Sequence, residues 1–276
     1  MNGKVYLVGA GPGNPELLTV KALRLLQTAD VVLHDDLVAP EILKLIAPTA
    51  QVQNVGKRCG TKTMRQEEIN FFLVTLAASG RQVVRLKSGD PLIFGRAGEE
   101  IEALQRANIG YEIVPGVTSA LGAAAAAGIP LTHRRISSTL VLTAGHRHRT
   151  SEHSDAKWGQ FAGTESTLVV YMPGHDYAEM ADRLTAGGFV EETPCAIISR
   201  ATTPQQQIHH TTILNLPESP RLAAPTLLVV GEVVRFAAHS AGQPEATFPV
   251  MENAFAAARV QGVVSAESLR QEERLA

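Results

Sequence analysis

The sequence predicts an α/β protein built on parallel β-sheet, and two observations support this class. Short runs of apolar, often β-branched residues alternate along the chain with longer segments in which apolar residues recur at helical spacing. The short runs are apolar throughout, which is typical of strands that helices cover on both faces. With 276 residues, the chain is long enough for one large domain or two smaller ones.

The first part of the chain predicts four strands and three helices. In the first helix, Leu18, Ala22 and Leu25 recur at helical spacing, and Gly80 follows the second helix as a typical C-terminal stop. A Pro-Gly pair after the fourth strand marks a turn. We expect strands at 5–8, 31–33, 83–86 and 113–114 and helices at 17–29, 66–78 and 99–107.

A boundary near 115–119 divides the chain. An alanine-rich helix is expected after it, and the polar segment 145–163 predicts a loop. Poor periodicity from about residue 241 predicts a tail. The helix is expected at 119–127 and further strands at 139–143, 168–172, 196–199 and 226–230. These elements predict domains at 1–116 and 117–240 and a tail at 241–276.

Composition argues against several classes of protein. The formal net charge of -2 gives no bulk attraction to nucleic acid or to an anionic membrane surface. No apolar run is long enough to cross a bilayer, and no secretory signal opens the chain. Cys59 and Cys195 are too few for a disulfide framework and match no metal motif. We therefore expect a cytoplasmic protein that binds neither nucleic acid nor a membrane.

A glycine-rich loop follows the first strand, where residues 9–15 read Gly-Ala-Gly-Pro-Gly-Asn-Pro. Such a loop lets backbone approach a ligand closely, although a simple tight turn explains it equally well. A dinucleotide-binding fingerprint would place a glycine where Asn14 stands, and Pro12 removes an amide that a pyrophosphate would use. A nicotinamide-dependent oxidoreductase is therefore disfavoured, although it stays an alternative.

The histidines do not predict a metal site. His146, His148 and His153 share one polar loop, and His209 and His210 are adjacent. None of these groups has a recognised ligand spacing with a third partner. We expect no metal cofactor.

A series of short blocks stands out beyond the glycine loop. They include Gly-Asp-Pro at 89–91, Phe-Gly-Arg at 94–96 and Pro-Leu-Thr-His-Arg at 130–134. In residues and in order, the blocks resemble the uroporphyrinogen-III C-methyltransferase family, within the tetrapyrrole methylases, over roughly residues 4–236. The other blocks are 5–13, 29–35, 56–58, 66–70, 85–88, 114–120, 168–172 and 225–231.

The resemblance implies a fold, a cofactor and a reaction. The implied fold is that of tetrapyrrole methylases, in which two α/β domains hold S-adenosylmethionine (SAM) in the cleft between them, and the protein is a homodimer. The implied reaction transfers methyl groups from SAM to C-2 and C-7 of uroporphyrinogen III. It passes through precorrin-1, gives precorrin-2 and S-adenosylhomocysteine, and feeds the synthesis of sirohaem, cobalamin or haem d1.

Site residues follow from the resemblance, position by position. It implies Asp35 as proton acceptor and Lys57 as proton donor, a pair whose pKa values the cleft would have to tune. Arg96 either clamps a substrate carboxylate through two parallel hydrogen bonds or caps local structure. Arg58, Glu99, His133 and Arg134 complete the implied substrate site. The implied SAM contacts are Pro12, Ser88, Gly89, Asp90, Ile93, Thr118, Ser119, Met172 and Ala201.

The sequence departs from the family pattern at a few positions. Ser88 and Ala201 stand where glycine is usual, and His34 stands where tyrosine is common. These changes leave a SAM site plausible and bear mainly on the substrate. The alternatives are a methylase acting on a later corrin precursor, on diphthine or on ribosomal RNA, and a relative that binds SAM without transferring its methyl group.

Overall fold

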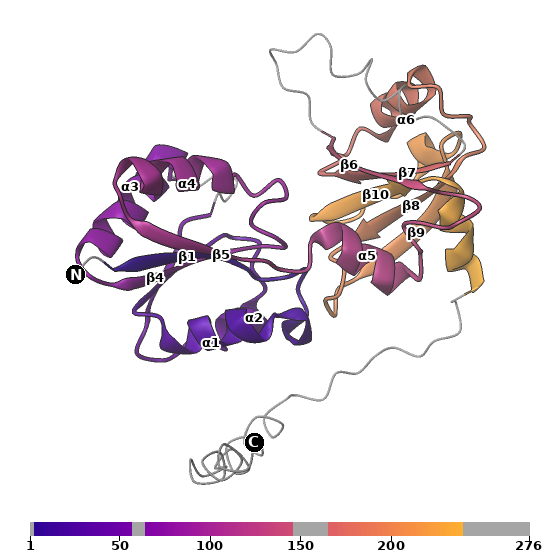
Figure 1. Cartoon of the computed structure of the whole chain (residues 1–276). Coiled ribbons are helices and arrows are strands. Elements are labelled where there is room, and N and C mark those ends of the chain that lie inside the picture. The colour runs from indigo at the N-terminus through magenta and orange to yellow at the C-terminus, as the bar shows by residue number, and fades with distance from the viewer. Residues whose placement is uncertain (1–2, 57–63, 146–164, 240–276) are drawn as a thin grey trace, which may run out of the picture. The chain divides into compact units, whose positions relative to one another are not determined.

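The computed structural model describes residues 3–56, 64–145 and 165–239. All of them belong to one compact unit that contains two five-stranded sheets (Figure 1). The α/β class is therefore confirmed, whereas the domain boundaries at 116 and 240 stay predictions. Among the described residues, no helix is long and apolar enough to cross a membrane.

The first sheet is entirely parallel, as the apolar runs predict. Its strand order is β3-β2-β4-β1-β5, so β1 and β4 lie inside the sheet with neighbours on both sides. Edge strand β3 was not predicted, because its residues are polar and mostly exposed. The strands are β1 (Lys4–Gly9), β2 (Val31–His34), β3 (Gln51–Asn54), β4 (Gln82–Lys87) and β5 (Gly110–Val114).

Helices cover both faces of this sheet (Figure 1). On one face, α1 (Val20–Thr28) and the short α2 (Pro40–Leu43) pack on the sheet through Leu26 and Ile42. On the other face, α3 (Gln66–Ala78) and α4 (Ala97–Arg106) pack through Leu73 and Leu104. The helix expected at 17–29 is shorter, because a 3-10 turn, η1 (Pro15–Leu17), precedes it and the Thr19 side chain caps α1 by accepting from the Ala22 amide.

The second sheet is mixed rather than parallel. Its order is β6-β7-β10-β8-β9, and only β6 and β7 run parallel. The prediction of a parallel sheet is therefore wrong for this sheet, because antiparallel strands that are covered on both faces give the same apolar runs as parallel ones. The strands are β6 (Thr139–Ala144), β7 (Ser166–Tyr171), β8 (Pro194–Ser199), β9 (Gln207–Thr212) and β10 (Thr226–Val230).

Helical elements cover both faces of the second sheet as well. The predicted alanine-rich helix, α5 (Ser119–Ala127), and the 3-10 segment η4 (Glu232–His239) share one apolar cluster with the sheet. The opposite face packs against α6 (Tyr177–Ala186) and the short η3 (Leu216–Glu218). Neither α6 nor edge strand β9 was predicted.

Candidate functional site

Glycines bring three loops together at the carboxyl edge of the first sheet. Gly11 and Gly89 exchange two backbone hydrogen bonds of 3.1 and 2.8 Å, so the loops after β1 and β4 are joined. A Cβ atom on Gly116, after β5, would lie 2.3 Å from the Gly89 carbonyl oxygen, and one on Gly9 would lie 2.5 Å from the Gly116 nitrogen. These loops are therefore packed backbone against backbone, which only glycine permits.

Asp90 fixes the geometry of this loop cluster. Its Oδ1 accepts a hydrogen bond from the Leu92 amide at 2.8 Å, and its Oδ2 accepts one from the Gly116 amide at 3.0 Å. Each carboxylate oxygen has more than one lone pair, so both can accept a further bond from a ligand. Ser88 and Asp90 are partly exposed, whereas Gly89 between them is buried.

The start of α5, just after the predicted domain boundary, completes the cluster. A Cβ atom on Gly89 would lie 3.4 Å from the Ser119 hydroxyl and 3.8 Å from the Thr118 Cα. A Cβ atom on Gly122 would lie 2.6 Å from the Pro12 ring. The structure thus brings together Pro12, the 88–90 loop and the start of α5, which the family resemblance assigns to one site.

The segment after β8 reaches the same glycine loop. The Asn14 amide donates to Thr202 Oγ1 at 3.2 Å, and a Cβ atom on Gly13 would lie 3.4 Å from the Ala201 carbonyl oxygen. Ala201 itself is buried in the apolar cluster beneath α5, together with the partly buried Ile93. Both residues therefore lie beside the loop cluster through packing rather than through polar contacts.

Tyr171, at the end of β7, connects three parts of this region. Its hydroxyl lies 2.6 Å from Thr118 Oγ1 and accepts from the Ala120 amide at 3.1 Å. Its ring lies 4.8 Å from that of Phe94, centroid to centroid. Sequence reasoning did not single out Tyr171, and the one available signal was its place directly before Met172.

Backbone strain is concentrated in the same loops. In these loops, five residues other than glycine have positive φ angles, between 46° and 64°. Such conformations cost about 1–3 kcal/mol each and gather at functional sites, where the surrounding structure holds them in place. The five residues are Phe94, Arg96, Met172, Arg200 and Thr202, and a further one, Asn108, lies elsewhere, after α4.

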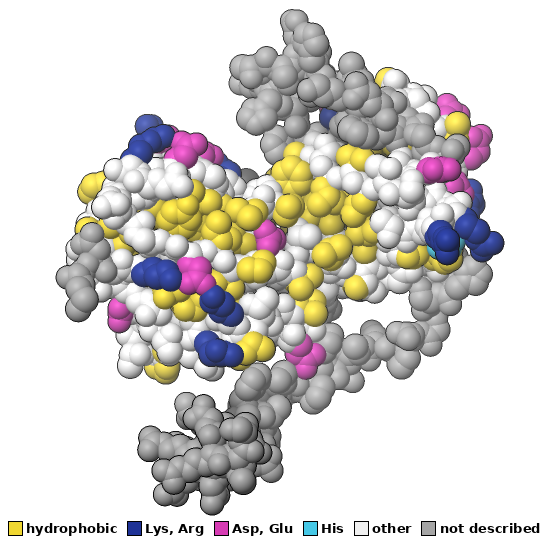
Figure 2. All heavy atoms as spheres, viewed as in Figure 1, with side chains coloured by type: hydrophobic (Ala, Val, Ile, Leu, Met, Phe, Trp, Pro, Cys, Tyr) yellow, Lys and Arg dark blue, Asp and Glu magenta, His cyan; other side chains and the backbone are white. Residues whose placement is uncertain are grey.

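Large apolar side chains of these loops face solvent. Leu92 is 59% exposed, Phe94 45% and Met172 48%. Figure 2 shows that hydrophobic side chains gather on the face turned to the viewer in both α/β parts of the chain. Exposed apolar surface beside polar acceptors is typical of a site for a small organic ligand.

Asp35 lies after β2, one strand away from the glycine loops. Its backbone amide bonds the Leu86 carbonyl oxygen at 3.1 Å, and its side chain, 29% exposed, forms an ion pair with the buried Arg85. Next to it, Asp36 accepts a hydrogen bond from the Asn54 side chain at 3.0 Å. The predicted Lys57 and Arg58 follow β3 in the sequence but lie outside the described residues.

Arg96 binds Glu99 through one edge of its guanidinium. Nε and Nη2 donate to the two carboxylate oxygens of Glu99, each at 2.7 Å, and this hydrogen bonding raises the pKa of Arg96. Both side chains are nearly half exposed. Exposed ion pairs contribute only about 0–1 kcal/mol, so a substrate carboxylate can replace Glu99 on Arg96 at low cost.

The predicted His133 and Arg134 belong to the second sheet's surroundings. The His133 ring lies 5.1 Å from that of Phe236 on η4, and its backbone amide bonds Ser137 at 2.8 Å. Arg134 is exposed. Neither contact ties these residues to the glycine loops or to Asp35.

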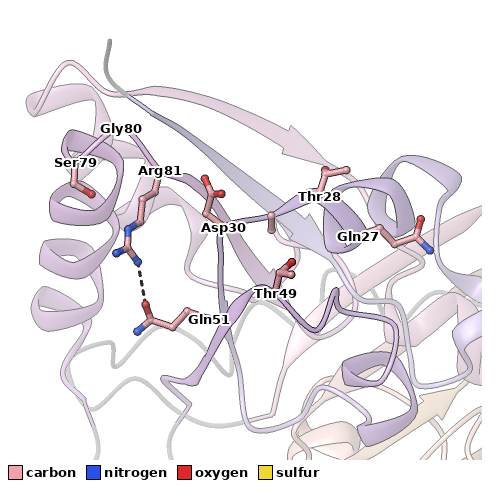
Figure 3. A pocket seen from close by; sticks show the side chains of 9 residues that line it. Gln27, Thr28, Asp30, Thr49, Gln51, Ser79, Gly80 and Arg81 are labelled. Carbon is pink, nitrogen blue, oxygen red and sulfur yellow. Dashed lines mark hydrogen bonds between the residues drawn. The ribbon is translucent and has the colours of Figure 1, made fainter.

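A polar depression lies at the opposite, amino edge of the first sheet (Figure 3). Arg81 donates to Gln51 at 3.0 Å there, and Asp30 accepts from the Gln82 amide at 2.7 Å. Arg81 is thus engaged with a neutral side chain and Asp30 with backbone. Because ligands of open α/β sheets bind beyond the carboxyl ends of the strands, the carboxyl-edge loops are the better candidate.

Comparison with known proteins adds independent information. The chain matches the family model of the Tetrapyrrole (Corrin/Porphyrin) Methylases over residues 4–217. It is 50% identical over 236 residues to a siroheme synthase of Azotobacter vinelandii, which covers 84% of this chain and 50% of that protein. The chain thus spans about half the length of the curated relatives that it matches.

Solved structures share the fold. A uroporphyrin-III C-methyltransferase of Thermus thermophilus, complexed with S-adenyl homocysteine, is 40% identical with a TM-score of 0.74, covering 84% of this chain and 99% of that one. A cobalt precorrin-4 methyltransferase is 33% identical with a TM-score of 0.74, covering 84% and 95%. The matched family model includes the whole cluster of glycine loops described above, and this chain belongs to the tetrapyrrole methylase family.

Proposed function

We propose that the chain is a SAM-dependent methyltransferase that converts uroporphyrinogen III into precorrin-2, through precorrin-1, by methylation at C-2 and C-7. Membership of the tetrapyrrole methylases and the likeness to the Thermus thermophilus enzyme support this reaction. The observation that carries the proposal is the convergence of Pro12, Asp90 and Thr118 on one loop cluster. The product would supply sirohaem, cobalamin or haem d1 synthesis.

The residues at the carboxyl edge fit SAM. The ligand has a ribose and an amino group that need acceptors, and Asp90 retains lone pairs beside the Leu92 and Gly116 amides. The faces of its adenine ring and the carbon atoms beside its sulfonium are apolar, and Met172 and Ile93 offer apolar contact. We propose that Pro12, Ser88, Gly89, Asp90, Ile93, Thr118, Ser119, Met172 and Ala201 hold SAM, which supplies an already activated methyl group.

With the methyl group already activated, the protein has to align two reactants and move a proton. Rigid loops suit alignment, which accounts for much of the catalysis in reactions of this kind. We propose Asp35 as the group that accepts the proton lost from the methylated ring and Lys57 as the donor. Arg96, which exchanges Glu99 for a substrate carboxylate, would orient the macrocycle together with Arg58, His133 and Arg134.

The assembly and the cellular setting belong to the same proposal. We propose a homodimer, as the resemblance to the family implies. The cytoplasmic location stays a prediction.

The decisive experiment is anaerobic incubation of the chain with uroporphyrinogen III and SAM, followed by mass analysis of the tetrapyrrole. We expect two added methyl groups, with a singly methylated species early in the time course. Methylation of a later corrin precursor, with uroporphyrinogen III untouched, would favour the second candidate, to which the likeness to cobalt precorrin-4 methyltransferase points.

SAM binding has its own test. Asp90→Ala should weaken SAM binding about 10- to 100-fold in calorimetry, the range for losing hydrogen bonds to a charged acceptor. Asp30→Ala is the matched control, because Asp30 also accepts a backbone amide but lies at the opposite edge of the sheet. Equal SAM affinity in the Asp90 and Asp30 variants would remove Asp90 from the site.

A further inference from the structure

The interior of the first sheet holds two positive charges. Arg85 and Lys87 lie two residues apart on β4, so their side chains leave the same face of the strand, and both are only 2% exposed. Burying an unpaired charge costs several kcal/mol, and apolar residues at these positions would often be as stable or more stable. Core packing alone therefore does not explain them.

Glu100 on α4 forms ion pairs with both cations. It is fully buried, and its Oε1 accepts from Arg85 Nε at 2.9 Å and from Lys87 Nζ at 3.0 Å. Gln66 of α3 donates to the same oxygen at 3.4 Å, whereas Oε2 has no hydrogen-bond partner among the residues that the structure describes. Helices α3 and α4 thus set the position of Glu100, and Glu100 sets the orientation of the Arg85 guanidinium.

The other end of Arg85 points toward the proposed active site. Nη1 donates to the carbonyl oxygens of Leu33 and Leu86 at 3.4 and 3.2 Å, and Nη2 donates to Asp35 Oδ1. One carboxylate oxygen of Asp35 is thereby held from inside the protein. The side chain remains 29% exposed, which leaves it accessible from solvent.

Lys87 extends the cluster to the SAM loop. A Cβ atom on Gly95 would lie 3.1 Å from Lys87 Cε and 2.6 Å from the Pro91 carbonyl oxygen, so the lysine stem packs beneath the 91–95 turn. Burial and the neighbouring Arg85 lower the pKa of Lys87. For Arg85, burial acts in the same direction, but Asp35 and Glu100 outweigh it, and the pKa of Arg85 is raised.

We propose that Lys87, Glu100 and Arg85 are positioning residues that fix Asp35 for proton transfer and set the charge around it. The proposal rests on the proposed function, in which Asp35 accepts the proton. Within the described part of the chain, the charged groups around Asp35 are Arg85 and Lys87 from β4, Glu100 from α4 and the adjacent Asp36. Two cations and two carboxylates balance in the cluster of Asp35, Arg85, Lys87 and Glu100, so removing either Glu100 or Lys87 changes the charge at Asp35 in a known direction.

The test uses two nearly isosteric variants with opposite charge effects. Glu100→Gln removes a negative charge and should move the acidic limb of the kcat profile to lower pH. Lys87→Met removes a positive charge and should move it to higher pH. Each shift should be about one pH unit, the order of magnitude for a unit charge several ångströms away at an effective dielectric constant of about 20. The double variant should return the limb close to that of the parent.

Turnover and binding separate positioning from general damage. Glu100→Gln should lower kcat about 10- to 100-fold, the loss expected for a misplaced reacting group, and leave the SAM dissociation constant within about twofold. Glu102→Gln is the matched control, since Glu102 lies on the same helix and pairs with Arg106 at the surface. It should leave kcat, the pH profile and SAM affinity unchanged.

A readout without catalysis distinguishes this proposal from the proposed function. Urea unfolding gives an equilibrium constant of unfolding for the parent, for Glu100→Gln, for Asp35→Asn and for the double variant. Because Arg85 links the two carboxylates, the constant of the double variant should differ at least about fivefold from the value obtained by multiplying the two single effects. If the parent methylates nothing, the proposed function fails and this cycle still tests the cluster. Multiplicative effects, or pH limbs that do not move apart in an active enzyme, would overturn the positioning role.

Discussion

The hydroxyl of Tyr171 offers a sharp test of how the proposed SAM site is held together. Tyr171→Phe removes one oxygen atom and keeps the ring that contacts Phe94. Two groups lose their partner, the Thr118 hydroxyl and the Ala120 amide. The amide belongs to the first turn of α5, where backbone N–H groups have no acceptor within the helix.

The expected magnitude follows from these two losses. A buried amide without a partner costs about 1–3 kcal/mol. Ala120 is fully buried, so water cannot easily replace the lost acceptor. The Thr118 hydroxyl is partly exposed and can turn to water, which adds little. We expect the free energy of unfolding to fall by about 2 kcal/mol, and SAM binding to weaken about tenfold, since Thr118 is a proposed contact.

The measurement combines urea unfolding with calorimetric titration of SAM. Tyr111→Phe is the matched control, because the Tyr111 hydroxyl accepts only an exposed hydrogen bond from Gln105, at 2.9 Å. It should change neither quantity appreciably. If Tyr171→Phe unfolds within about 0.5 kcal/mol of the parent and binds SAM within twofold, the three-way connection described here does not operate.

Three further predictions concern packing, substrate and pH. Gly116→Ala should lower the free energy of unfolding, measured in urea, by about 3 kcal/mol, because the new Cβ would lie 2.3 Å from a backbone oxygen. The control Gly98→Ala has no atom within 4 Å of the new Cβ and should raise the free energy of unfolding by up to about 1 kcal/mol. Similar effects of the two variants would contradict the backbone packing. Arg96→Ala should spare SAM binding but lower turnover of uroporphyrinogen III about 100-fold, and near-parental turnover would exclude the substrate clamp. Lys21 and Lys4 lower the pKa of Glu112 from 4.5 to about 2, so this carboxylate stabilises the fold above pH 4.5 and loses that effect as the pH falls toward 2. The stability difference between parent and Glu112→Gln should accordingly close over this range, and a gap that persists at pH 2 would contradict the assignment.

Sequence reasoning predicted the interior of the fold better than its edges. The buried strands gave strong signals because Val31–His34 and Thr226–Val230 are enclosed on both faces. Strands β3 and β9 gave none, since edge strands carry polar residues toward solvent. Strand direction in the second sheet was also unpredictable, because it depends on how the connections run and not on which residues are buried.

The same contrast holds for the site. The family resemblance named Pro12, Asp90 and Thr118, and the loops that carry them lie packed together. Their role in binding SAM stays a prediction. Contacts between residues far apart in the sequence could not be predicted from local patterns. Arg85 and Glu100 are 15 positions apart, and Tyr171 and Thr118 are 53 positions apart. A charged residue within an apolar run was the available clue to the buried cluster, and Arg85 carried it.

The backbone packing of Gly9, Gly89 and Gly116 has a consequence for how such an enzyme changes its substrate. Glycine backbone forms most of the framework that joins the loops, and the Asp90 carboxylate completes it, so other side chains that project from the loops can be exchanged without disturbing it. Leu92 and Phe94 are such projections. Replacing them should redirect selectivity among macrocycles while SAM stays bound, which makes these two positions the natural starting points for engineering new alkylation specificity.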